Sequence, residues 1–141
     1  MRHVLLALLF AMPAAQAVAC SVVIPESKLH LYTTPAYFER ADNVAVVQVD
    51  EIVATQTPEG TREKVRFSIV HDIKDTLPPT FEDEAIALMG CGPEYTVGRQ
   101  YVLFFEADKR GVGRISTARG PLEPETSWTR ELLAELQQLS N

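Results

Sequence analysis

The stretch from Val44 to Thr55, VAVVQVDEIVAT, decides the fold. Its β-branched residues recur at period two, which is typical of a strand. We expect Val47, Val49 and Val53 to share a face with Ala45. The opposite face is expected to carry Val44, Val46, Gln48, Asp50 and Ile52. This pattern predicts a strand that is buried where it begins and half exposed where it ends.

A turn and a second strand follow directly. Residues 57 to 60, TPEG, favour a tight turn, and residues 65 to 74, VRFSIVHDIK, alternate again. One face of this segment is expected to carry Val65, Phe67, Ile69, His71 and Ile73. The sequence therefore predicts two long antiparallel strands joined by a short loop.

Three more strands are expected further along the chain. Apolar residues run from Ala85 to Met89, before the cluster Gly90, Cys91, Gly92 and Pro93. After Gly98 comes a continuous apolar run, typical of a strand covered on both faces, in which Tyr101, Leu103 and Phe105 oppose Val102 and Phe104. A turn over residues 108 to 111 precedes a short strand from Val112 to Ser116. Pro121 and Pro124 then bracket a linker.

Helical signals flank these strands. Residues 21 to 31 have no clear period and are expected to form an extended arm. Thr34 and Pro35 resemble a helix start, with an apolar face at Tyr37, Phe38 and Ala41. After Glu125, one helical stripe is expected to pack on the sheet, formed by Trp128, Leu132, Leu133, Leu136 and Leu139. The fold class is mainly β: five strands in a closed or nearly closed small barrel, with a short N-terminal helix and a C-terminal amphipathic helix.

The first nineteen residues have the three-part plan of a cleavable secretory signal. A basic start precedes the apolar run from Val4 to Met12, and small residues follow Pro13 up to Ala19. The run is about half the length that a bilayer requires. We therefore expect export to the periplasm or the medium, with residues 20 to 141 as one mature domain.

The mature domain is acidic. Removal of Arg2 with the signal leaves 12 Lys and Arg against 19 Asp and Glu, a formal charge of −7. Such a charge repels phosphate backbones, so nucleic acid is not an expected partner. The aromatic residues that could stack on bases are expected to be internal, namely Phe67, Tyr101, Phe104 and Phe105.

Two cysteines, Cys20 and Cys91, remain after processing. An even count in an exported chain favours a disulfide, which would contribute roughly 4 kcal/mol in the chain-entropy model. The alternative is that Cys20, as the first mature residue, is acylated as in bacterial lipoproteins. Ala17 stands where those signals usually have Leu, so the fit is partial. Only a lipidated Cys20 would place the protein on a membrane.

The order of several short motifs resembles the netrin-like domain family, which includes the tissue inhibitors of metalloproteinases and small exported bacterial proteins. The motifs are Cys20 with Ser21, the segment ADNV at 41 to 44, Cys91 with Gly92, and VGRQY at 97 to 101. The resemblance implies a five-stranded oligonucleotide/oligosaccharide-binding (OB) barrel. It also implies a disulfide between the N-terminal cysteine and the Cys-Gly pair, here Cys20 and Cys91, 71 positions apart.

The resemblance further implies a protease-binding edge, made of Cys20, Ser21, Val22, Val23 and Gly92. In the inhibitors, the α-amine and carbonyl of the first residue bind the protease's catalytic zinc, and the second side chain enters the specificity pocket. An α-amine has a pKa near 8, so it can lose its proton and coordinate zinc. Here Val22 stands where the inhibitors have a second cysteine, and a looser arm is expected.

No enzyme motif is recognised in the sequence. His30 and His71 have no metal-ligand spacing, and His71 is expected to be a core or rim histidine. The run Glu82 to Glu84 is interpreted as a solvated turn rather than a cation site. We therefore expect a non-enzymatic protein-binding domain with no cofactor and no metal of its own. Its partner is an unknown protein, with a zinc metalloendopeptidase as the specific candidate; the alternative is a lipid-anchored envelope protein with a structural or scaffolding role.

Overall fold

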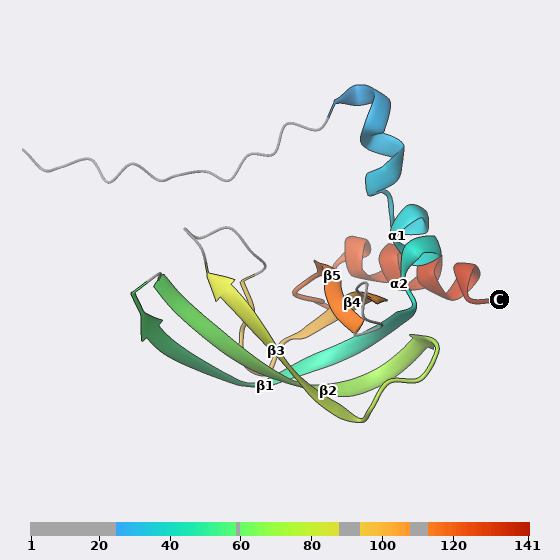
Figure 1. Cartoon of the computed structure of the whole chain (residues 1–141). Coiled ribbons are helices and arrows are strands. Elements are labelled where there is room, and N and C mark those ends of the chain that lie inside the picture. The colour runs from blue at the N-terminus through green and yellow to red at the C-terminus, as the bar shows by residue number, and fades with distance from the viewer. Residues whose placement is uncertain (1–24, 59, 88–93, 108–112) are drawn as a thin grey trace, which may run out of the picture.

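A computed structural model describes residues 25–58, 60–87, 94–107 and 113–141 of the chain. Five strands and three helical segments form this part (Figure 1). In chain order they are η1 (Glu26–Tyr32), α1 (Thr34–Arg40), β1 (Asn43–Thr57), β2 (Gly60–Lys74), β3 (Thr80–Ala87), β4 (Gln100–Ala107), β5 (Gly113–Arg119) and α2 (Ser127–Leu139). The expected mainly β class with flanking helices is confirmed.

All five strands belong to one antiparallel sheet with the order β3-β2-β1-β4-β5. The predicted β1–β2 hairpin is confirmed, with Thr57 paired to Gly60. In the described residues β3 and β5 do not pair with each other, so each is an edge of the sheet. The third strand begins at Thr80, five residues before the predicted start, and the fifth extends to Arg119.

The sheet is strongly curled. Phe81 of β3 and Phe105 of β4 are separated by three strand spacings, about 14 Å in a flat sheet. Their ring centroids are nevertheless 5.2 Å apart. Phe67 of β2 stacks on Phe81 at 5.0 Å, so the aromatic residues meet inside the curl.

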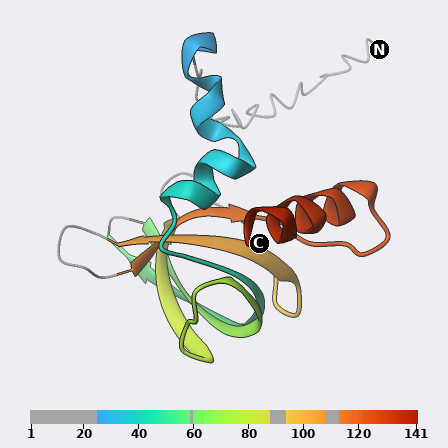
Figure 2. The same cartoon turned by 90° about the vertical axis from the view of Figure 1, so that its right-hand side faces the viewer.

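Hydrophobic clusters cover the two faces of the sheet. The inner cluster, inside the curl, contains Ala45, Val47, Val49, Val65, Phe67, Tyr101, Leu103 and Phe105. The outer cluster, under the helices, contains Phe38, Ala41, Val44, Val46, Val102, Phe104, Leu122, Leu132 and Leu136. Figure 2 shows α1 and α2 on the same side of the sheet. The prediction that β4 is covered on both faces is confirmed, and so is the burial of its aromatic residues.

A β-bulge in β1 corrects the predicted pattern of its second half. Val49 pairs with Phe67 and Glu51 with Arg66, so Asp50 is an extra residue in the ladder. An extra residue exchanges the faces of every side chain that follows it. Ile52 therefore packs on the inner cluster, and Val53 is 48% exposed. The predicted faces of these two residues are wrong.

The helices also differ in part from the prediction. Residues 26 to 32 form the 3₁₀ helix η1 rather than an extended arm. The cap of α1 is Thr33, whose hydroxyl oxygen accepts a hydrogen bond from the Ala36 amide at 3.4 Å, so the predicted cap at Thr34 is one residue late. In α2, Leu132 and Leu136 pack on the outer cluster as expected. Trp128 and Leu139 do not: they lie at the two ends of α2 and are 46% and 37% exposed.

Two short sequence motifs have definite structural roles. Asp42 connects the start of β1 to the end of β4, because its Oδ2 atom accepts a hydrogen bond from the Ala107 amide at 2.6 Å. Gly98 has φ +80°, a conformation that favours glycine. Its amide donates to the Val49 carbonyl at 2.7 Å, which joins the loop before β4 to β1.

Candidate functional site

The predicted protease-binding edge lies outside the described residues. This applies to Cys20, Ser21, Val22, Val23 and Gly92, and equally to Cys91 of the predicted disulfide. The signal segment, residues 1 to 19, also lies outside them. The described residues nearest to this edge in sequence are Pro25, which directly precedes η1, and Glu94.

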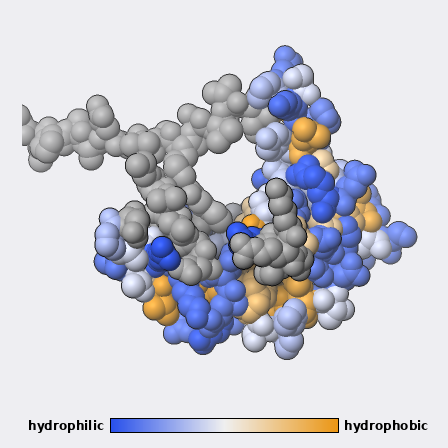
Figure 3. All heavy atoms as spheres, viewed as in Figure 1, coloured by the Kyte–Doolittle hydropathy of each residue, from blue (hydrophilic) through white to orange (hydrophobic). Residues whose placement is uncertain are grey.

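The apolar side chains of η1 are exposed. None of its residues is buried, and Leu29, Leu31 and Tyr32 are 51%, 42% and 44% exposed. Figure 1 shows η1 projecting from the body of the domain above α1. In Figure 3 an apolar patch is visible at the foot of this projection, among hydrophilic neighbours. Exposed apolar groups of this kind mark contact surfaces more often than isolated surface leucines do.

The foot of η1 is held by α1, which in turn is tied to the sheet. Arg40 donates a hydrogen bond from Nη1 to the Leu31 carbonyl at 2.9 Å and forms an ion pair with Glu106 at 3.6 Å. The Tyr37 ring contacts Tyr32 at 6.4 Å between centroids. The guanidinium groups of Arg40 and Arg119 lie 4.9 and 5.2 Å from the centroid of the Tyr37 ring. These contacts fix the direction in which η1 leaves the domain.

A groove lies between the start of α1 and the first half of α2. It has a volume of about 360 Å³ and is lined by Thr34, Trp128, Glu131, Leu132 and Glu135. Of these residues Leu132 is buried, and the two glutamates give the lining an acidic character. The sequence pattern predicts that Trp128 packs on the sheet and does not predict that it lines this groove. The period of a helical stripe does not indicate which end of the helix extends past the sheet.

A second groove, of about 540 Å³, lies between β2 and the end of α2. Its lining includes Val46, Val70, Gln100 and Leu133, together with His71. His71 is exposed and lies at the rim of this groove. The rim is one of the two positions expected for His71. Its expected face, shared with Val65, Phe67 and Ile69, is wrong, because the register of β1 and β2 shifts between Val46 and Val47, opposite His71 and Ile69.

The acidic run from Glu82 to Glu84 belongs to β3 and not to a turn. Glu82 pairs with Lys64 and with Arg66, whose Nη2 atom is 3.3 Å from Glu82 Oε1. The hydrogen bond from Lys64 lowers the pKa of the Glu82 carboxyl. Arg66 also pairs with Glu51 at 2.9 Å, so the charges form a ladder across three strands. This arrangement is structural and leaves no free carboxylate pair for acid–base chemistry at Glu82.

Tyr95, in the loop before β4, is a second titratable side chain with a shifted pKa. Burial raises the pKa of the Tyr95 hydroxyl, and the charge of Asp83 adds to this, so the group stays protonated. Nowhere in residues 25–58, 60–87, 94–107 and 113–141 do three or more His, Cys, Asp or Glu side chains gather as metal ligands would. Over the same ranges, no helix has the length and apolar character needed to cross a bilayer.

Neither a protein-family model nor a curated protein matches the chain.

Proposed function

We propose that this chain is an exported, non-enzymatic protein-binding domain of the netrin-like family, and that it acts through its mature N-terminal segment. The observation that carries the proposal is the exposed apolar surface of η1. This helix begins three positions after Val23, and it projects from the domain with Leu29, Leu31 and Tyr32 about half exposed. A partner bound at Cys20 to Val23 would meet these side chains next.

The strand order supports an OB-like barrel. The order β3-β2-β1-β4-β5 is that of an OB barrel opened between its third and fifth strands. The contact between the Phe81 and Phe105 rings brings β3 towards β4 across the interior. Asp42 and Gly98, which belong to two of the motifs of the resemblance, both make interstrand connections.

The specific form of the proposal is inhibition of a zinc metalloendopeptidase. The free α-amine and carbonyl of Cys20 would coordinate the protease's zinc, and Ser21 would enter its specificity pocket. A disulfide from Cys20 to Cys91 would hold the chelating atoms in place and reduce the entropy lost on binding. The domain itself needs no metal and no cofactor for this role.

The test compares two forms of the exported protein against a panel of zinc endopeptidases. One form begins at Cys20, and the other retains Ala19 before it. The extra residue converts the α-amine into an amide, which does not coordinate zinc in the same way, so inhibition should weaken by at least about tenfold. Equal inhibition by both forms would contradict the chelation mechanism.

A second comparison tests the contribution of η1. Leu29→Ser removes an exposed apolar side chain from η1, and Leu139→Ser makes the same change at the far end of α2, where the leucine is 37% exposed. Leu29→Ser should weaken binding to the protease, and Leu139→Ser should leave it unchanged. If Leu139→Ser weakened binding as much as Leu29→Ser, or more, η1 would not be part of the contact surface.

The alternative proposal is a lipid-anchored envelope protein with a structural or scaffolding role. It requires acylation of Cys20, which blocks or crowds the amine and leaves Cys91 without its predicted partner. The mass of the exported protein distinguishes the two proposals.

A further inference from the structure

The second half of β1 has a strand partner on one side. Residues Glu51 to Gln56, which we term the distal edge, pair with β2 in an unbroken register from Arg66 to Thr61. The ladder with β4 ends at Gln48, and two further hydrogen bonds hold Val49 against the loop before β4. Within the described ranges no strand pairs with the other side of the distal edge. Figure 1 shows this end of β1 as the outermost strand of the hairpin.

Apart from Glu51 and the bulge at Asp50, the distal edge lacks the features that protect sheet edges. Natural edges carry charged residues or proline, which discourage pairing with a second chain. β3 has three consecutive acidic residues at 82 to 84, and β5 has Arg114 and Arg119. From Ile52 to Gln56 the distal edge has neither a charge nor a proline, and it includes the β-branched residues Ile52, Val53 and Thr55.

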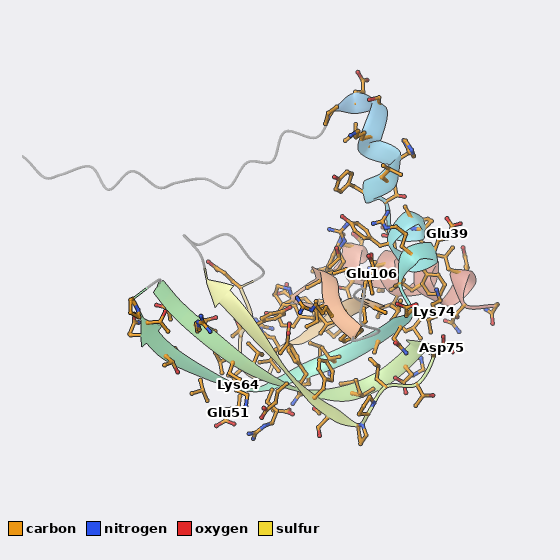
Figure 4. The ribbon with its side chains drawn as sticks, in the orientation of Figure 1. Glu39, Glu51, Lys64, Lys74, Asp75 and Glu106 are labelled. Atoms are coloured by element: carbon orange, nitrogen blue, oxygen red, sulfur yellow. The ribbon has the colours of Figure 1, made fainter. Side chains whose placement is uncertain are left out.

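The outer face of the distal edge is partly apolar. Val53 is 48% exposed, and it lines a hollow together with Glu51 and Lys64. Figure 4 shows Glu51 and Lys64 projecting from the same face of the β1–β2 hairpin. The charge of Glu51 is already compensated by Arg66 at 2.9 Å, so it does not oppose an approaching strand strongly.

The distal edge is complementary to a second copy of itself. An antiparallel pair with a two-fold axis through Val53 places Val53 opposite Val53, Ile52 opposite Ala54, and Glu51 opposite Thr55. Opposed residues then lie on the same face of the continuous sheet, and no like charges face each other. A parallel pair in register would instead place Glu51 beside Glu51.

We propose that the protein forms a homodimer through antiparallel pairing of its distal edges. The sheet β3-β2-β1 of one copy continues into β1-β2-β3 of the other, as in β-strand addition. Six residues make a small interface, so we expect a dissociation constant on the order of 100 µM. The inference rests on the distal edge alone and does not depend on the chemistry of Cys20.

Sedimentation equilibrium of the mature protein, from about 10 µM to about 1 mM, tests the proposal. Wild-type protein should show a reversible monomer–dimer equilibrium. Val53→Lys places two ammonium groups opposite each other at the axis and should raise the dissociation constant at least about tenfold. Val70→Lys is the matched control, since Val70 is a valine with 50% exposure elsewhere in the sheet, and it should leave the constant unchanged.

Three results would overturn the proposal: a monomeric wild type over the whole range, a Val53→Lys variant that dimerises like wild type, or equal weakening by Val70→Lys. Cross-linking tests the register independently. Val53→Cys should form a reducible dimer on mild oxidation, because directly opposed Cβ atoms lie about 4.5–5.5 Å apart. Val70→Cys should not. Equal cross-linking of both variants, or of neither, would contradict the two-fold axis at Val53.

Discussion

The two halves of β1 lie in opposite environments, although one continuous strand forms both. From Val44 to Val49 the strand lies between β2 on one side and β4 with the loop before it on the other, and five of these six residues are buried. From Glu51 to Gln56 it pairs with β2 alone, and most residues are exposed. The bulge at Asp50 separates the halves. The first half therefore supplies the core, and the second half supplies surface.

The largest effect on stability is expected from a substitution in the core that covers the first half of β1. Phe104 is fully buried in the outer cluster, pairs with Val44, and has its ring centroid 5.9 Å from that of Tyr37. Phe104→Ala should lower the free energy of unfolding by about 3–5 kcal/mol, because it leaves a cavity between the sheet and α1. Val53→Ala, in the exposed half, should change it by less than about 0.5 kcal/mol.

Urea denaturation of the two variants measures this contrast. Similar losses from both would show that the distal half of β1 is as tightly packed as the first half.

An intermediate effect is expected where a loop packs on the covered part of the sheet. A Cβ atom added at Gly120 would lie 2.5 Å from Cδ1 of the Tyr101 ring, which is itself buried. Because Gly120 also has φ +156°, Gly120→Ala should destabilise the protein by at least about 1–3 kcal/mol, through overpacking together with a strained backbone conformation. Gly98→Ala meets no atom within 4 Å and should cost about 1–2 kcal/mol, from its positive φ alone.

Thermal denaturation, with a crystal structure of the Gly120→Ala variant, separates the two causes. If the Gly120→Ala variant were as stable as wild type and its Tyr101 ring had not moved, the short distance between position 120 and the ring would be contradicted.

The smallest effect is expected in the exposed charge ladder. The hydrogen bond from Lys64 lowers the pKa of the Glu82 carboxyl. At pH values above the pKa that Glu82 has in the unfolded chain, this pair therefore stabilises the folded state. That contribution is lost as the pH falls through the folded pKa. Lys64→Met should raise the pKa of Glu82, with only a small change in stability because both groups are exposed.

Carboxyl titration by NMR measures the pKa of Glu82 directly. Lys28→Met, in η1, is the control and should leave that pKa unchanged. A Glu82 pKa that does not respond to Lys64→Met would show that the ion pair is not maintained in solution.

The sequence predicted the covered regions better than the exposed ones. Continuous apolar runs, as in β4, leave little choice of structure, and both of its faces are buried as expected. The bulge at Asp50 could not be foreseen, because one extra residue leaves the local composition unchanged and shifts only the faces that follow. The exposure of Trp128 depends on where α2 lies relative to the edge of the sheet, which periodicity does not encode. The acidic run in β3 has the composition of a turn, and its pairing with Lys64 and Arg66 of a neighbouring strand cannot be read from that composition.

The parts of the candidate site also differ in how far the sequence predicts them. The role of Cys20 and its neighbours follows from a resemblance to a family, and these residues lie outside the described part of the chain. The exposed apolar surface of η1 could be recognised only in the structure, since residues 26 to 32 have no sequence period.

The intact mass of the exported protein, measured before and after reduction, tests the proposed free N-terminus most directly. The account predicts the unmodified mass of residues 20 to 141, lighter before reduction by the two hydrogen atoms that a Cys20 to Cys91 disulfide removes. A mass increased by acyl chains at Cys20, or a pair of free thiols in the exported protein, would contradict it.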